Sequence, residues 1–131
     1  MPILFPRKQE VLEIHAQLIR ASGGIHGLRD EAILESALLA AENRSHYEVA
    51  GLITCAATYA YHLTQAHAFI DGNKRIAAAV SEVFLELNGA RLNATNEQIV
   101  NLFLDIAASR LSRKDVEEFF RRWTVALIAD Q

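Results

Sequence analysis

Residues 67–75 of the chain read His-Ala-Phe-Ile-Asp-Gly-Asn-Lys-Arg. This stretch places a histidine, a carboxylate, a glycine, an amide and two cations within a single turn of chain. Apolar segments of helical character lie on both sides of it. A junction between two buried helices has no structural need for so many polar groups. The stretch therefore indicates both the centre of the fold and the candidate functional site.

The two flanking segments predict the central helices. Residues 48–66 are apolar on nearly all faces, which is typical of a helix at the centre of a fold. After the polar stretch, a helix is expected to begin near Asn73 and to stop at Asn88-Gly89, because glycine readily adopts the conformation that ends helices. The apolar positions on this second helix are Ile76, Val80, Val83, Phe84 and Leu87.

Four more helices are predicted around this pair. The first runs from Pro6 to Gly23-Gly24, the second is capped around Asp30, the fifth begins with a capping box at residues 95–98, and the sixth begins near Ser112 with an apolar face that extends to Leu127. The only prolines lie before residue 7. The sequence thus predicts an all-α fold. We expect a single domain over residues 1–131, folded as a compact bundle of about six helices with the active loop between helices three and four.

Composition and charge exclude several classes of protein. The chain has 131 residues, 51% of them hydrophobic and 22% charged, and a net charge of −3. No basic stripe is present, so direct nucleic-acid binding is not expected. No stretch approaches the ~20 apolar residues of a membrane span, and the N-terminal segment lacks the charge order of a secretory signal. The single cysteine, Cys55, is expected to be buried and inert, in keeping with a cytoplasmic protein.

The residues of the polar stretch fit phosphate chemistry. Gly72 permits a tight turn, and the free amides at the start of the following helix form an anion site at the positive end of the helix dipole. Lys74 and Arg75 add two charges that oppose this dipole, which an anion bound there would explain. Asp71 suits Mg²⁺, because that ion is usually held by one or two carboxylates together with substrate phosphates. His67 can act as a general base near neutral pH.

Each residue also has a purely structural interpretation. A lone histidine such as His67 is more often structural than catalytic, and Asp71 could cap the next helix. Lys74 and Arg75 could form a solvated face, while Phe69 is expected to pin the loop to the core. The joint occurrence of these residues at fixed spacing favours the functional interpretation.

The stretch resembles the signature of the Fic/Doc family. In that signature a histidine and an apolar residue are followed by Asp or Glu, a small residue, Asn, a variable position and Arg. Lys74 is similar to the death-on-curing (Doc) form, because most Fic proteins carry glycine there. Residues 23–30, 34–38 and 78–89 also resemble the family's segments around the signature, so the resemblance covers nearly the whole chain.

The resemblance implies a toxin-type protein kinase. Doc proteins transfer the γ-phosphoryl group of ATP to a threonine of elongation factor Tu, which stops translation. They are held inactive by a cognate antitoxin, whose C-terminal helix is expected to bind an apolar groove. Carried over to this sequence, His67 is the base, Asp71 holds Mg²⁺, and the phosphates of ATP are bound by Gly72, Asn73, Lys74 and Arg75.

Two alternatives stay open. The first is an adenylyl (AMP) transferase of the Fic type, which Lys74 and Ala78 disfavour, because that activity is associated with glycine and a second arginine at these positions. The second is a non-catalytic module that acts only through its antitoxin complex. The presence of His67, Asp71 and Asn73 together disfavours it.

An inhibitory motif within the chain is not expected. The Fic self-inhibition motif places Ser or Thr four residues before a Glu that is followed by Gly or Asn. The closest candidate is Glu42-Asn43, where Leu38 stands in place of the hydroxyl residue. The sequence therefore predicts a separate inhibitor.

Overall fold

The computed structural model describes residues 2–127, and these residues form a mostly helical fold. The helices and strands, in chain order, are α1 (Lys8–Ser22), α2 (Glu31–Glu48), α3 (Leu52–Ala66), α4 (Asn73–Leu87), β1 (Ala90–Leu92), α5 (Asn96–Ala107), α6 (Arg113–Trp123) and β2 (Thr124–Ala126). The six helices and one small two-stranded sheet of this described part of the chain confirm the fold class predicted from the sequence.

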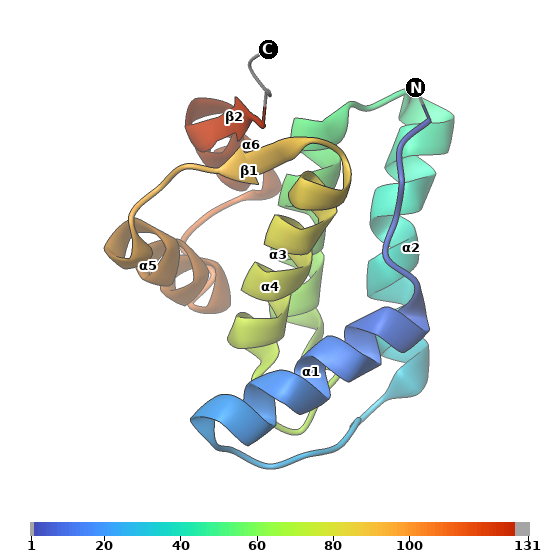
Figure 1. The fold of residues 1–131 in the computed structure, drawn as a ribbon, viewed down its shortest axis with the longest axis vertical. Helices are drawn as coiled ribbons and strands as arrows, with labels where there is room; N and C mark the ends of the chain where they lie inside the picture. The colour runs from blue at the N-terminus through green and yellow to red at the C-terminus, as the bar shows by residue number, and fades with distance from the viewer. Residues whose placement is uncertain (1, 128–131) are drawn as a thin grey trace.

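Helices α3 and α4 stand at the centre of the fold (Figure 1). Helix α3 packs against α2, α4, α5 and α6, and its residues 55–60 are all buried, as the sequence predicts for a helix apolar on all faces. Helix α1 lies across the end of the bundle where the loop between α3 and α4 emerges (Figure 1). Within residues 2–127, no helix combines the length and apolar character needed to cross a membrane.

Three helix N-termini have side-chain caps, two of them predicted from the sequence, and the third lies at Ser112, where a helix start was predicted. The Asp30 carboxylate accepts a hydrogen bond from the backbone N–H of Ile33 at 3.1 Å, which fixes the start of α2. Helices α5 and α6 begin with complete capping boxes, in which two side chains each bond the backbone N–H of the other residue. The pairs are Thr95 with Gln98 and Ser112 with Asp115. Such caps stabilise a helix by roughly 1 kcal/mol each, because they satisfy amides that have no partner inside the helix.

The boundary between α2 and α3 differs from the prediction. The sequence places the start of the third helix at Glu48, but α2 extends to Glu48 and α3 begins only at Leu52. Val49 ends α2 in the left-handed conformation, with φ 53°, and its side chain is 87% exposed. Val49 shares the apolar spacing of α3, so periodicity alone assigned it to the wrong helix. Helix α1 likewise begins at Lys8, two residues later than expected.

The end of α6 also differs from the sequence prediction, which extended the helix face to Leu127. The helix stops at Trp123, and Thr124–Ala126 forms β2, which pairs antiparallel with β1. Leu127 does not lie on a helical face, because its N–H donates to the carbonyl of Gly89 at 2.8 Å. The pairing joins segments far apart in the chain, which helical periodicity cannot reveal.

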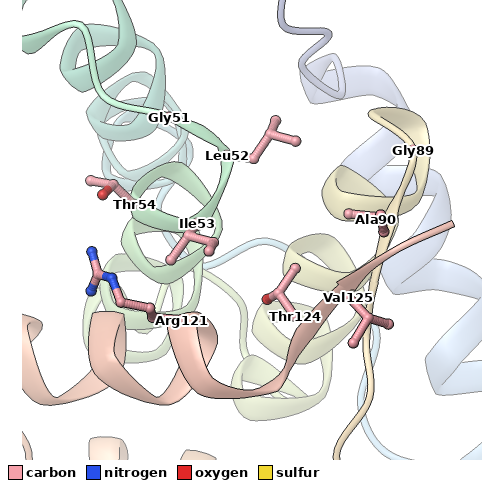
Figure 2. A pocket seen from close by; sticks show the side chains of 10 residues that line it. Gly51, Leu52, Ile53, Thr54, Gly89, Ala90, Arg121, Thr124 and Val125 are labelled. Carbon is pink, nitrogen blue, oxygen red and sulfur yellow. The ribbon is translucent and has the colours of Figure 1, made fainter. Parts of the chain in front are cut away.

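The two strands border a hollow of about 590 Å³ (Figure 2). Its other wall is the N-terminal turn of α3, so it lies at the end of α3 away from His67. The lining residues are Gly51, Leu52, Ile53, Thr54, Gly89, Ala90, Arg121, Thr124, Val125 and Ala126. None of the residues predicted to be functional lines this hollow.

Cys55 is buried in α3, as predicted. Burial raises the pKa of its thiol to about 11, outweighing the nearby positive charge of Arg44. Little thiolate is therefore present at pH 8, and we expect iodoacetamide to leave the native protein unmodified while the urea-unfolded chain is alkylated. Mass spectrometry after a timed reaction measures this, and equal alkylation of the two states would contradict the burial.

Candidate functional site

The loop between α3 and α4 has two sharp backbone turns. Helix α3 ends at Ala66, and His67 follows in the left-handed conformation with φ 51° and ψ 45°. Gly72 precedes α4 with φ 77°. The His67 carbonyl accepts a hydrogen bond from Nε of Arg29 at 2.8 Å, and the His67 side chain is exposed. The loop thus presents the predicted base to solvent from a fixed backbone.

Backbone pairing with the segment before α2 anchors the loop. Phe69 is only 3% exposed, which confirms it as the apolar anchor, and it forms an antiparallel bridge with Leu28. The carbonyl of Ala68 accepts hydrogen bonds from the N–H groups of Arg29 and Asp30, at 2.7 and 3.0 Å. These contacts fix the loop at its middle, between the two turns.

The Asn73 side chain braces the loop from the other side. Its Oδ1 accepts a hydrogen bond from the Phe69 N–H at 3.0 Å, and its Nδ2 donates to the Phe69 carbonyl at 2.9 Å. Both polar atoms of the amide are therefore engaged with one residue. A phosphate contact by Asn73, as predicted from the sequence, falls to its backbone N–H.

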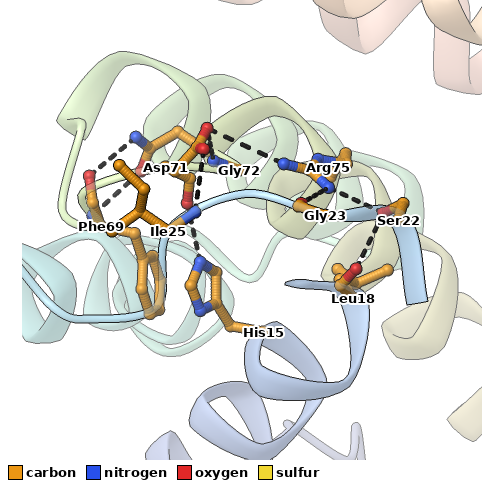
Figure 3. A network of polar contacts seen from close by, with 10 residues as sticks. His15, Leu18, Ser22, Gly23, Ile25, Phe69, Asp71, Gly72 and Arg75 are labelled. Carbon is orange, nitrogen blue, oxygen red and sulfur yellow. Dashed lines mark hydrogen bonds and ion pairs between the residues drawn. The ribbon is translucent and has the colours of Figure 1, made fainter. Parts of the chain in front are cut away.

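Asp71 lies where three parts of the chain meet (Figure 3). Its Oδ2 accepts a hydrogen bond from the N–H of Ile25 at 3.1 Å, and its Oδ1 accepts one from the N–H of Gly72 at 2.8 Å. The Arg75 guanidinium lies 3.8 Å from Oδ1. The two backbone hydrogen bonds, with a smaller contribution from Arg75, lower the pKa of Asp71 below its ordinary value.

The Asp71 carboxylate is suited to Mg²⁺ held jointly with a nucleotide. It is ionised, its side chain is 43% exposed, and its two hydrogen bonds leave lone pairs on both oxygens. Within residues 2–127, no three His, Cys, Asp or Glu side chains gather into a metal site. A single carboxylate fits Mg²⁺, because that ion commonly keeps several waters and completes its shell with substrate phosphates.

The two cations of the loop have different environments. Arg75 Nη1 donates to Ser22 Oγ at 2.7 Å and to the Gly23 carbonyl at 2.8 Å, so this side chain ties α4 to the C-terminal end of α1 (Figure 3). Lys74 is exposed and borders an apolar hollow of about 200 Å³ between α4 and α5. Lys74 has no hydrogen-bond or ion-pair partner among residues 2–127 and can meet an anion, whereas Arg75 can do so only together with its present partners or by giving them up.

The N-terminus of α4 has an open first turn. No side chain among residues 2–127 caps it at Gly72. The backbone amides of Asn73, Lys74 and Arg75 therefore remain as donors at the positive end of the helix dipole. The loop and this turn bring all the predicted site residues together, with His67 at one end and the amides at the other.

The sequence matches the Fic/DOC family over residues 5–85, which is more than half of the chain. The chain belongs to the Fic/DOC family. The matched region contains α1 to α3, most of α4 and the loop described above, so it includes the whole site. The search of curated proteins gave no match. Fic proteins are transferases that use ATP with Mg²⁺, which agrees with a site built from a base, a carboxylate and an open helix N-terminus.

Two residues of this Fic/DOC site were missed by the sequence analysis. His15 on α1 is 3% exposed, and its Nε2 lies 2.7 Å from the carbonyl oxygen of Asp71. Gly24 approaches Asp71 so closely that a Cβ atom there would lie 2.7 Å from Oδ2. The only signal for His15 was a histidine placed between the core residues Val11 and Ile19 of one helix face. For Gly24 the sequence indicated only the end of a helix.

Proposed function

We propose that the protein transfers the γ-phosphoryl group of ATP to a hydroxyl group of a target protein. The observation that carries this proposal is the start of α4, where free amides and the exposed Lys74 form an anion site next to the ionised Asp71. A helix N-terminus of this kind favours phosphate groups.

The roles of the residues follow from their positions. His67 takes the proton from the target hydroxyl, whose oxygen then bonds to the γ-phosphorus while the bond to the β,γ-bridging oxygen breaks and ADP leaves. The amides of α4 and Lys74 hold the phosphate oxygens in place. Mg²⁺ held by Asp71 would neutralise charge on these oxygens.

The residues at positions 74 and 78 favour attack on the γ-phosphate. Adenylyl transfer requires that the β- and γ-phosphates be held as the leaving group, which needs room over the turn and a cation one turn further along α4. Here Lys74 occupies the first position, and Ala78 brings no charge to the second. We propose that the triphosphate therefore lies with its γ-phosphate towards His67.

A second candidate activity is adenylyl transfer. It is favoured by the apolar hollow of about 200 Å³ between α4 and α5, whose lining includes Ala78 and Phe103. A purine base seated there would bring the α-phosphate, the one nearest the base, towards the start of α4. The two activities differ in the atom that is attacked, so they can be separated by isotope labelling.

We further propose that the acceptor is a threonine of elongation factor Tu and that a cognate antitoxin, through a C-terminal helix, inhibits the protein in the cytoplasm. The resemblance of residues 67–75 to the Doc form of the signature supports both proposals. Expression of the protein alone should arrest growth, and co-expression of an antitoxin encoded beside it should restore growth. Normal growth of cells that accumulate the folded protein would contradict the toxin proposal.

Labelled ATP tests which group moves. We expect purified protein with elongation factor Tu and Mg²⁺ to transfer label from [γ-³²P]ATP and none from [α-³²P]ATP. Mass spectrometry should find a phosphoryl group on the target. Transfer of α-label would establish adenylyl transfer instead.

Replacement of Asp71 tests the carboxylate. Asp71→Asn keeps an oxygen that can accept the Ile25 N–H but removes the charge, so we expect weaker Mg-ATP binding and at least about a hundredfold lower turnover. Calorimetry with Mg-ATP and a γ-label assay measure the two effects. Unchanged affinity and turnover would make Asp71 a structural residue only.

The pH dependence gives a further control for this variant. The pKa of Asp71 is lowered on folding, so its contribution to stability is complete above its ordinary value of 3.8 and is lost as pH falls through the lower folded-state value. The difference in Tm between wild type and Asp71→Asn should therefore be constant from pH 5 to 8 and disappear in more acidic buffer.

A further inference from the structure

We infer that His15 is a positioning residue that fixes the peptide group between Asp71 and Gly72, and through it the direction of the Gly72 N–H beside the phosphate site. The role for the phosphate site rests on the proposed function. His15 lies on α1, far from the loop in sequence, and Figure 3 shows its ring directed at the turn.

The contacts of His15 are specific. Its ring stacks on Phe69 with centroids 3.8 Å apart and an angle of 15° between the planes. Its Nε2 lies 2.7 Å from the carbonyl oxygen of Asp71, and because a carbonyl can only accept, Nε2 must carry the proton. The imidazole thus contacts the loop through one face and one edge.

Holding the Asp71 carbonyl sets the direction of the next N–H. The peptide bonds of the described residues are all trans, and in a trans peptide the C=O and N–H point in opposite directions. With the carbonyl held by His15, the Gly72 N–H points away from α1 and meets Asp71 Oδ1 at 2.8 Å. The same peptide group therefore links His15 to the orientation of the Asp71 carboxylate.

Gly72 makes this support necessary. Its φ of 77° is easily reached by glycine, but glycine also has access to many other backbone conformations. The turn therefore needs an external contact to hold one peptide orientation. Helix α1 is close enough to provide it, since a Cβ on Gly72 would lie 3.2 Å from Ile19 Cδ1 and 3.5 Å from His15 Nε2.

Two variants separate the contribution of the donor from that of the ring. His15→Phe keeps an aromatic ring for the stack on Phe69 but has no N–H for the Asp71 carbonyl. His15→Gln keeps a donor at about the same reach but loses the ring. If His15 only fills the core, activity should follow stability, and His15→Phe should be at least as active as His15→Gln.

We expect the opposite order. His15→Phe should lower kcat for γ-phosphoryl transfer by about 10- to 100-fold, because small displacements of a reacting group have effects of this size. His15→Gln should stay within about threefold of wild type even where its Tm is lower. A ranking of kcat that follows Tm, or wild-type kcat in His15→Phe, would overturn the inference.

A readout independent of activity completes the test. In ¹⁵N-labelled protein, the Gly72 amide resonance should shift strongly in His15→Phe and stay near its wild-type position in His15→Gln. If His15→Phe does not fold, His15→Gln decides the question alone, and a displaced Gly72 amide with more than tenfold loss of kcat would refute the inference. If wild type transfers no group at all, the proposed function fails, while the Gly72 resonances still show whether His15 orients this peptide.

Discussion

Replacing His67 with alanine should lower phosphoryl transfer by about 10²- to 10⁴-fold, the usual effect of removing a general base. His67 is exposed at the C-terminal end of α3, so no packing in the core depends on its ring. Its left-handed backbone, however, disfavours alanine slightly. His67→Asn is therefore the better variant, because asparagine tolerates that conformation and cannot take up a proton at neutral pH.

Three proteins make the test complete. His67→Asn and His67→Ala should both be inactive with a Tm close to that of wild type, and His46→Ala, which removes another exposed histidine on α2, should be fully active. Initial rates with [γ-³²P]ATP and thermal unfolding measure the two properties. If His67→Asn were active and only His67→Ala inactive, His67 would serve the turn at the end of α3 and not the chemistry.

The sequence predicted those parts of the fold that depend on local signals. The caps at Asp30, Thr95 and Ser112 act within four residues, and each begins a helix where expected. The failures involve contacts between distant segments or an ambiguous residue. Pairing of β2 with β1 ended α6 at Trp123, and the left-handed Val49, whose spacing fits α3, ends α2 instead.

The same distinction applies to the site. All nine residues of 67–75 lie in one loop and one helical turn, so spacing in the sequence was enough to bring them together. The residues that orient this loop come from α1 and the segment after it. His15 and Asp71 are 56 positions apart, and the Ile25 N–H reaches Asp71 from 46 positions away. No local pattern encodes such contacts.

The side chains of Asn73 and Arg75 support the loop, one through a local contact and the other through distant ones. The sequence predicted that Asn73 and Arg75 help to bind the phosphates of ATP, Asn73 through its backbone amide at the start of the helix. In the folded chain Asn73 holds both backbone groups of Phe69, and Arg75 reaches Gly23 and Ser22. A conformation in which phosphate is held by backbone amides and Lys74 leaves both side chains in place as supports.

Gly24 gives the most severe test of these supports. Its φ is +121°, and a Cβ would lie 2.7 Å from Asp71 Oδ2, 3.0 Å from Arg75 Nη2 and 3.1 Å from Ile19 Cδ1. Alanine at this position would have to displace the Asp71 carboxylate or the backbone that carries the Ile25 N–H. Either movement separates Asp71 from a donor that keeps it ionised and oriented.

We therefore expect Gly24→Ala to lower kcat/KM for phosphoryl transfer by about 100-fold, since an error of about 1 Å in a reacting group has this effect. Gly89→Ala is the matched control. Gly89 also has a positive φ, of +81°, but it lies at the far end of α4. A Cβ there would meet no atom of the described residues within 4 Å, apart from its chain neighbours.

Both variants should lose about 1–2 kcal/mol of stability through backbone strain, with a further loss in Gly24→Ala from the clash. Urea unfolding and the γ-label assay measure both quantities. Equal activity in the two variants would mean that the contact between this segment and Asp71 does not position the carboxylate for transfer.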